Sequence, residues 1–216
     1  TKVTLSGNDA GSFSYGEDLA TELAMKGETG DQDDFTISYD GTCTGTCTCV
    51  VTIHLDEFDM EDFTFAIVYA DCDHIPSNER ITSTATWDGW NVILDNYNIK
   101  DGGELSISGN VGFSDQVNLV VEPGGRLILD GGTLTNVCGN TWKGIDVWGD
   151  ASLCQYPNSN QGYLAIKNGG TIQNADIAVQ VADAPDVNTY TVLTTGGIVK
   201  CDSAIFINNR YDVVIY

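Results

Sequence analysis

Residues 122–149 read EPGGRLILDGGTLTNVCGNTWKGIDVWG. This stretch holds two short runs of alternating aliphatic residues, each preceded by a Gly-Gly pair, and a third run that contains two tryptophans. Alternation with a period of two is typical of β-strands, and glycine pairs are typical of corners that need positive φ or close backbone approach. The stretch therefore predicts one coil of a parallel β-helix.

The pattern recurs on both sides of this stretch. The segments ELSISGN, RLILDGGTLTN, YLAIKNGGTIQN and YTVLTTGGIVKC start at residues 104, 126, 163 and 190, which are 22, 37 and 27 residues apart. Strands that stack at ~4.8 Å must repeat, whereas the loops between them can vary in length. A base coil of about 22 residues with a long insertion at 136–161 fits these offsets. The aligned pairs are Leu127 with Leu164, Leu134 with Ile172, Asn136 with Asn174, Leu193 with Ile166, and Val199 with Ile172.

Alternation also predicts which side chains face the lumen of the helix. The expected inward residues are Leu105, Ile107, Val117, Leu119, Val121, Leu127, Leu129, Ile145, Val147, Leu164, Ile166, Ile177, Val179, Val181, Ile205 and Ile207. Asn136 and Asn174 should form an inward asparagine ladder that satisfies backbone groups of the turns. An all-β sandwich built from the same strands is the competing interpretation.

Residues 1–86 do not show this repeat. The segment 18–26 has the spacing of a short helix, and the polar segment 75–88 has the character of a join. The predicted fold is therefore all-β: a small β-rich, sandwich-like domain in residues 1–86, followed by a right-handed parallel β-helix (a solenoid) in residues 87–216. Strands in the first domain are expected at 2–5, 35–39, 49–55 and 63–69.

The chain is strongly acidic, with 31 acids against 9 bases and a net charge of −22. Such a surface repels nucleic acid and anionic lipid, and no apolar run approaches the ~20 residues of a membrane span. Solubility, divalent-cation binding and repulsion of other acidic surfaces remain as explanations of the charge. Asp31, Asp33 and Asp34 are candidate Ca²⁺ ligands, because closely spaced loop carboxylates suit that cation, although a solvated loop has the same composition.

Seven cysteines indicate an extracellular protein with disulfides. Zinc bound with His54 and His74 is an alternative, but the cysteine spacing is not that of a zinc knuckle. A disulfide between Cys138 and Cys154 would pin the long insertion, and Cys201 would remain free at the position of Asn174 in the repeat. Two further disulfides, with the pairing open, are expected among Cys43, Cys47, Cys49 and Cys72.

Aromatic residues are the candidate ligand contacts, since exposed rings stack on sugars or on other proteins. Alternatively, these rings cover the boundary between the β-helix and its long insertion or the N-terminal domain. Catalytic groups are sparse: the bases after residue 87 are scattered along the chain without histidine, and Asp146 and Asp176 are the carboxylates nearest to alignment. The chain is therefore expected not to be an enzyme. The candidate ligand contacts are Trp142, Trp148, Tyr163 and Tyr190.

The stretch EPGGRLILDGGTLTN followed by WKGIDVWG resembles the right-handed parallel β-helix segments of large secreted surface proteins of Bacteroidota, which are type IX secretion cargo and include adhesins and filaments. This resemblance covers residues 87–216. It implies an extracellular, non-catalytic structural or adhesive module that contacts other surface proteins, neighbouring segments of its own longer chain continuing past residue 216, or polysaccharide. The alternative is a carbohydrate-active β-helix enzyme, a polysaccharide lyase or glycoside hydrolase, or a carbohydrate-binding module.

Overall fold

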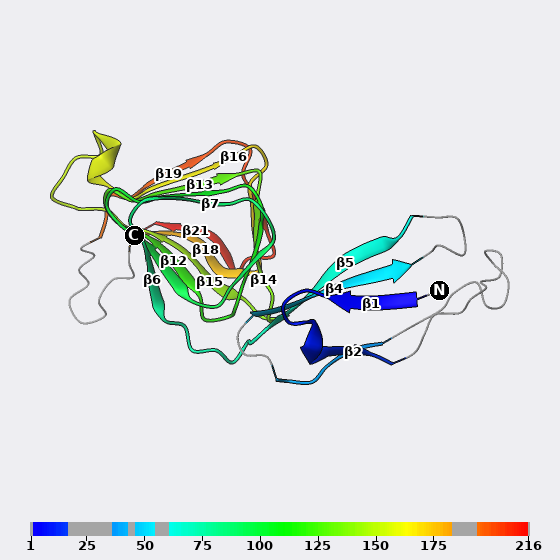
Figure 1. The fold of residues 1–216 in the computed structure, drawn as a ribbon. Helices are drawn as coiled ribbons and strands as arrows, with labels where there is room; N and C mark the ends of the chain where they lie inside the picture. Colours follow the sequence, from blue (N-terminus) through cyan, green and yellow to red (C-terminus); the bar gives the residue numbers. More distant parts are fainter. Residues whose placement is uncertain (1, 17–35, 43–45, 55–60, 183–193, 216) are drawn as a thin grey trace. The chain divides into compact units, whose positions relative to one another are not determined.

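The computed structural model describes residues 2–16, 36–42, 46–54, 61–182 and 194–215 (Figure 1). The chain divides into two compact units, Thr1–Asp71 and Cys72–Tyr216. The described parts of both units are built from strands, with only two short 3-10 turns, Ala10–Ser12 and Asn158–Asn160. The all-β prediction is therefore confirmed.

The first unit contains two small antiparallel sheets. One is formed by β1 (Lys2–Ser6), β4 (Thr46–His54) and β5 (Phe63–Ala70), and the other by β2 (Phe13–Tyr15) and β3 (Ile37–Tyr39). Alternation along β4 buries Cys47 and Cys49, which share a core with Phe13 of the other sheet. The start of the chain, predicted to be a small β-rich, sandwich-like domain, is thus confirmed as β-rich and consists of small antiparallel sheets in its described residues. The helix predicted at 18–26 lies outside the described residues.

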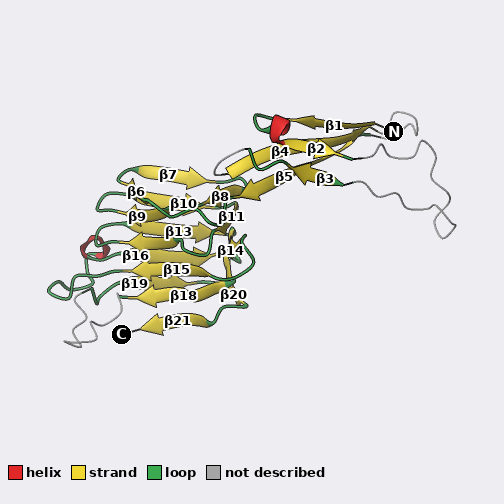
Figure 2. Ribbon diagram, turned by 90° about the horizontal axis from the view of Figure 1, so that it is seen from below, coloured by secondary structure: helices red, strands yellow, loops and turns green. Residues whose placement is uncertain are grey.

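The second unit contains three parallel sheets whose strands recur every third along the chain (Figure 2). Each passage through the three sheets is one coil, so the parallel β-helix is confirmed. Sheet I holds β7 (Thr84–Trp87), β10 (Glu104–Ile107), β13 (Arg126–Asp130), β16 (Tyr163–Lys167) and β19 (Ile198–Cys201). Sheet II holds β8 (Asn91–Ile93), β11 (Asn110–Phe113), β14 (Thr133–Asn136), β17 (Thr171–Gln173) and β20 (Ile205–Ile207). Sheet III holds β6 (Asn78–Ile81), β9 (Asn96–Ile99), β12 (Asn118–Val121), β15 (Trp142–Val147), β18 (Ala175–Val181) and β21 (Tyr211–Ile215).

The lumen of the helix is filled by aliphatic side chains stacked in register. Leu105, Leu127 and Leu164 form one such column across β10, β13 and β16, and all three are fully buried. The inward positions predicted for β10 to β16 are confirmed. The prediction for Ile205 and Ile207 is wrong, since they are 45% and 47% exposed. Phe206 lies in register with the inward Ile172 and packs against the core instead, so its two neighbours point outward.

Glycines mark the corners at which consecutive coils approach most closely. A Cβ atom on Gly125 would lie 2.3 Å from the carbonyl oxygen of Ile99, and one on Gly197 would lie 2.3 Å from that of Val147. Both glycines immediately precede a strand of sheet I. Only a residue without a side chain fits there, which explains the recurrence of glycine at this corner.

The alignment predicted for the last repeat segment is wrong by one corner. Val199 lies in register with Leu164, not with Ile172, and Cys201 lies in register with Ile166, not with Asn174. The chain uses Gly-Gly pairs both before and after strands of sheet I, so the glycine pattern alone does not distinguish the two corners. Cys201 is free, as predicted, but it is exposed.

Asparagines recur at the corner between sheets II and III. Asn174 accepts a hydrogen bond from Nδ2 of Asn208 at 3.3 Å, and both residues have positive φ. Asn136 instead donates to Phe113 O and Asp115 Oδ1 at 3.2 and 2.8 Å. Asn136 serves the turn backbone as predicted, since its Oδ1 also accepts a hydrogen bond from the N–H of Cys138 at 2.8 Å. The predicted ladder between Asn136 and Asn174 is wrong, because Asn174 instead donates to Oγ1 of Thr135 at 3.0 Å.

Candidate functional site

The outward side of sheet I forms a polar surface, named here the sheet I face. Since residues alternate along each strand, the side chains between the buried leucines and isoleucines point outward. A hollow of about 520 Å³ opens on this face between β10, β13 and β16. Its outward lining residues are Glu104, Ser106, Arg126, Ile128, Asp130, Tyr163, Ala165 and Lys167.

Tyr163 stands at the centre of an aromatic and cationic cluster on this face. The guanidinium carbon of Arg126 lies 4.6 Å from the centroid of the Tyr163 ring, and Nζ of Lys200 lies 5.6 Å from it. Nε of Arg126 also donates to Oε2 of Glu104 at 3.0 Å. Cations within about 6 Å of an aromatic centroid are attracted to the ring. The Tyr163 ring therefore helps to fix two cations that come from the neighbouring strands β13 and β19.

A second polar pair lies further along the same strands. Nζ of Lys167 lies 3.0 Å from Oδ2 of Asp130, and Nδ2 of Asn168 donates to Oδ1 of Asp130 at 2.6 Å. The hydrogen bond from Asn168, followed by that from Lys167, holds the pKa of Asp130 below its ordinary value. Asp130 therefore stays ionised at neutral pH and keeps the Lys167 ammonium group in place.

An ordered loop, residues 148–162, emerges at the edge of the sheet I face, immediately before Tyr163. Its anchor is Gln161, whose side chain is fully buried. Nε2 of Gln161 donates to the carbonyl oxygens of Asp150 and Leu153, both at 3.1 Å, and its Oε1 accepts from the backbone N–H of Asp150 at 2.6 Å. This single side chain thus satisfies the loop backbone, while Leu153 and Tyr156 at the surface are 49% and 83% exposed.

The structure separates the four predicted contact residues. Tyr163 belongs to the sheet I face, and Tyr190 lies outside the described residues. Trp142 is fully buried and stacks on Phe113 with ring centroids 4.3 Å apart, so its prediction as a ligand contact is wrong. A register irregularity in β15 beside Gly144 brings Trp142 into the inward set together with Ile145. Trp148 is half-buried at the start of the loop.

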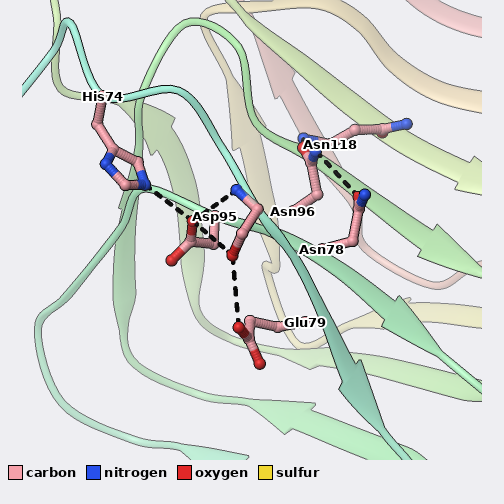
Figure 3. A network of polar contacts seen from close by, with 7 residues as sticks. His74, Asn78, Glu79, Asp95, Asn96 and Asn118 are labelled. Carbon is pink, nitrogen blue, oxygen red and sulfur yellow. Dashed lines mark hydrogen bonds and ion pairs between the residues drawn. The ribbon is translucent and has the colours of Figure 1, made fainter.

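A short segment, residues 72–77, crosses the corner between sheets II and III, and it is named here the strap. At one end Cys72 is bonded to Cys138, with Cα atoms 5.6 Å apart. At the other end Asp95 Oδ1 accepts hydrogen bonds from the backbone N–H and hydroxyl of Ser77, at 2.8 and 3.0 Å, and contacts Nε2 of His74 at 2.9 Å (Figure 3). A hollow of about 590 Å³ is lined by the strap, Asp115 and Lys143.

The asparagine ladder beside the strap was not predicted. Nδ2 of Asn96 donates to Oδ1 of Asn78 at 3.3 Å, and the backbone N–H of Asn118 donates to Oδ1 of Asn96 at 2.9 Å (Figure 3). Each of these residues is the first of a sheet III strand. The recurrence of asparagine at intervals of 18 and 22 residues, close to the length of one coil, was the available signal. The β-helix therefore begins at β6, inside the segment expected to be a join.

The predicted disulfide between Cys138 and Cys154 is wrong, because Cys138 pairs with Cys72 and Cys154 is free and exposed. Cys138 follows β14 and Cys154 follows β15, so the length of β15, roughly 20 Å for six residues, lies between them. Disulfides require Cα atoms within about 7 Å.

The cysteines of the first unit only partly follow the prediction. Cys49 is free and buried, so its predicted disulfide is wrong, whereas Cys47 is in a disulfide. Cys43 lies outside the described residues.

The carboxylates considered for glycoside hydrolysis do not form a pair. Asp146 lies in register with Gln180, not with Asp176. Asp146 accepts a hydrogen bond from Nδ2 of Asn118 at 2.8 Å, and Asp176 accepts one from Arg210 at 3.2 Å. Each carboxylate thus has its own polar partner on sheet III. The predicted alignment of Asp146 with Asp176 is wrong.

The candidate calcium ligands Asp31, Asp33 and Asp34 lie outside the described residues. Within the described ranges, no group of three or more His, Cys, Asp or Glu side chains is arranged to hold a metal ion. Among the same residues, no helix has the length and apolarity needed to cross a membrane.

The disulfides indicate an oxidising, non-cytosolic compartment. No protein-family model, curated protein or solved structure was found to match the chain.

Proposed function

We propose that this chain is a non-catalytic extracellular module of a cell-surface or filament protein. In this proposal the β-helix is a stiff support, and the sheet I face, with the loop at its edge, is the surface that contacts another protein or a polysaccharide. The observation that carries the proposal is the five-stranded sheet I, whose outward side chains stand in columns along the stack. Solenoids use extended surfaces of this kind to bind other macromolecules.

Four further observations support the proposal. The disulfides fit an extracellular location. The net charge of −22 favours solubility of an exposed module. The resemblance of residues 122–149 to secreted surface proteins of Bacteroidota supports assignment to that class of protein, exported by type IX secretion. The lumen, packed with aliphatic side chains, supports a structural role for the interior of the helix.

Binding and turnover measured together test this function. The purified chain is immobilised, exposed to neutral and acidic polysaccharides, and assayed in parallel for release of reducing ends and unsaturated sugars. We expect binding without turnover, weakened roughly ten-fold by Tyr163→Ala. Tyr211→Ala is the matched control, because an arginine, Arg210, also lies over that ring but on another sheet. Catalysed sugar release, or equal loss of binding in both variants, would contradict the proposal.

A further inference from the structure

We propose that Arg126 and Lys200, both held close to the Tyr163 ring, bind carboxylates of an acidic polysaccharide lying along the sheet I face. This inference rests on the contact function proposed above and names the class of its ligand. Its basis is a pair of cations that share one aromatic ring, on strands β13 and β19.

Both cations keep hydrogen-bond donors for a ligand. Arg126 donates to Glu104 through Nε, and its two Nη groups have no acceptor among the described residues. Nζ of Lys200 likewise has no carboxylate within 4.0 Å in the described part of the chain. A guanidinium group whose terminal nitrogens are open is suited to a planar carboxylate, which accepts two parallel hydrogen bonds. Tyr163 acts as a positioning residue, because its ring limits the conformations of both cations before a ligand arrives.

The charge balance of the face also differs from that of the chain. The whole sequence has 31 acids and 9 bases, whereas the five strands of sheet I carry two acids and three bases. The bases are Arg126, Lys167 and Lys200, and the acids are Glu104 and Asp130. An anion therefore meets less repulsion on the sheet I face than over the acidic surface as a whole.

A polysaccharide fits this face better than an extended peptide. The strands β10, β13 and β16 are interior strands of sheet I, so their backbone groups are paired on both sides. A peptide cannot add to them as a further strand, and recognition must use side chains alone. The strands that carry Arg126 and Lys200, β13 and β19, are two strand spacings apart, roughly 10 Å. A stiff polymer with regularly repeated carboxylates can therefore meet both cations at once.

Alginate and its propylene glycol ester test the inference, since the two polymers share a backbone and differ in the charge of the carboxyl groups. Binding of each to the immobilised chain is measured by biolayer interferometry at low and moderate salt. We expect alginate to bind and the ester to bind at least ten-fold more weakly. Arg126→Gln and Lys200→Gln should each weaken alginate binding roughly ten-fold. Arg210→Gln on sheet III is the matched control and should leave binding unchanged.

The other outcomes are informative in different ways. Equal binding of alginate and its ester would overturn the carboxylate assignment and leave a glycan-contact function intact. Binding of neutral polysaccharides alone would have the same consequence. Equal loss of binding in Arg126→Gln, Lys200→Gln and Arg210→Gln would show non-specific charge attraction and overturn the site. Loss of the β-sheet circular dichroism signal in Arg126→Gln would move the test to Lys200→Gln, whose exposed side chain has no carboxylate partner among the described residues.

Discussion

Cys72 and Cys138 are 66 residues apart in the sequence and are joined by a disulfide that ties the strap to the corner following β14. The other end of the strap is held by Asp95, which lies just before β9. The strap therefore connects corners of different coils on one side of the stack. It supplements the backbone ladders of the three sheets, which join each coil only to its immediate neighbours.

Removing this disulfide should destabilise the second unit. The double variant Cys72→Ser/Cys138→Ser loses a cross-link that closes a 66-residue loop, and the chain-entropy relation gives about 4 kcal/mol for a loop of that length. We expect a lower melting temperature in thermal unfolding followed by circular dichroism. Cys154→Ser removes an exposed free thiol and is the control, with no expected change. An unaltered melting temperature in the double variant would show that this disulfide does not stabilise the second unit.

Replacing Gln161 should loosen the loop that borders the sheet I face. Gln161→Leu removes three hydrogen bonds to the backbone of Asp150 and Leu153, each with a net contribution of about 0.5–1.5 kcal/mol. We expect lower stability in urea unfolding and faster proteolysis within residues 148–162. Gln155→Leu is the control, because Gln155 is exposed and makes one hydrogen bond, to Gly196. Unchanged proteolysis in Gln161→Leu would contradict an anchoring role.

A methyl group at the sheet I corner should force consecutive coils apart. In Gly125→Ala the new Cβ would lie 2.3 Å from the carbonyl oxygen of Ile99, so the backbone must shift. Overpacking of this kind costs about 1–3 kcal/mol. Gly89→Ala is the matched control, since a Cβ atom at residue 89 would have no neighbouring atom within 4 Å. Equal unfolding free energies of the two variants in guanidinium would refute close coil approach as the reason for glycine at residue 125.

The sequence was sufficient to predict the coils because two physical constraints repeat in it. Stacked strands require aliphatic residues at every second position, as at Leu127 and Leu164, and close corners require glycine, as at Gly125. These constraints act locally and are visible in one coil at a time. The register of β10, β13 and β16 followed correctly from them.

The features that the sequence did not predict depend on contacts between distant residues. The partner of Cys138 is determined by the path of the strap, which has no repeat of its own. The burial of Trp142 depends on a local irregularity of β15 that shifts its register. The arrangement around Tyr163 combines residues from three coils, and each of them alone looks like an ordinary surface residue. Only the stacking of coils brings Arg126 and Lys200 to the same ring.

The strap should also give the protein a characteristic response to acid. The side-chain contact with His74, followed by the hydrogen bonds from Ser77, holds the pKa of Asp95 below its ordinary value. A carboxyl group with a lowered pKa in the folded state stabilises the fold fully above its unfolded pKa, about 3.9, and loses that contribution as the pH falls through the folded pKa. The stabilisation from Asp95 should therefore persist at neutral pH and fade below about pH 4.

Urea unfolding of the wild-type chain and of Asp95→Asn between pH 2 and pH 7 measures this contribution. The wild-type chain should be more stable at pH 5 to 7, and the difference should shrink below about pH 4, because protonated Asp95 and asparagine are both neutral. Asp88→Asn, which alters an exposed carboxylate on the same unit, is the control. A difference that grows on acidification, or stays constant down to pH 2, would mean that the ionised Asp95 does not hold the strap.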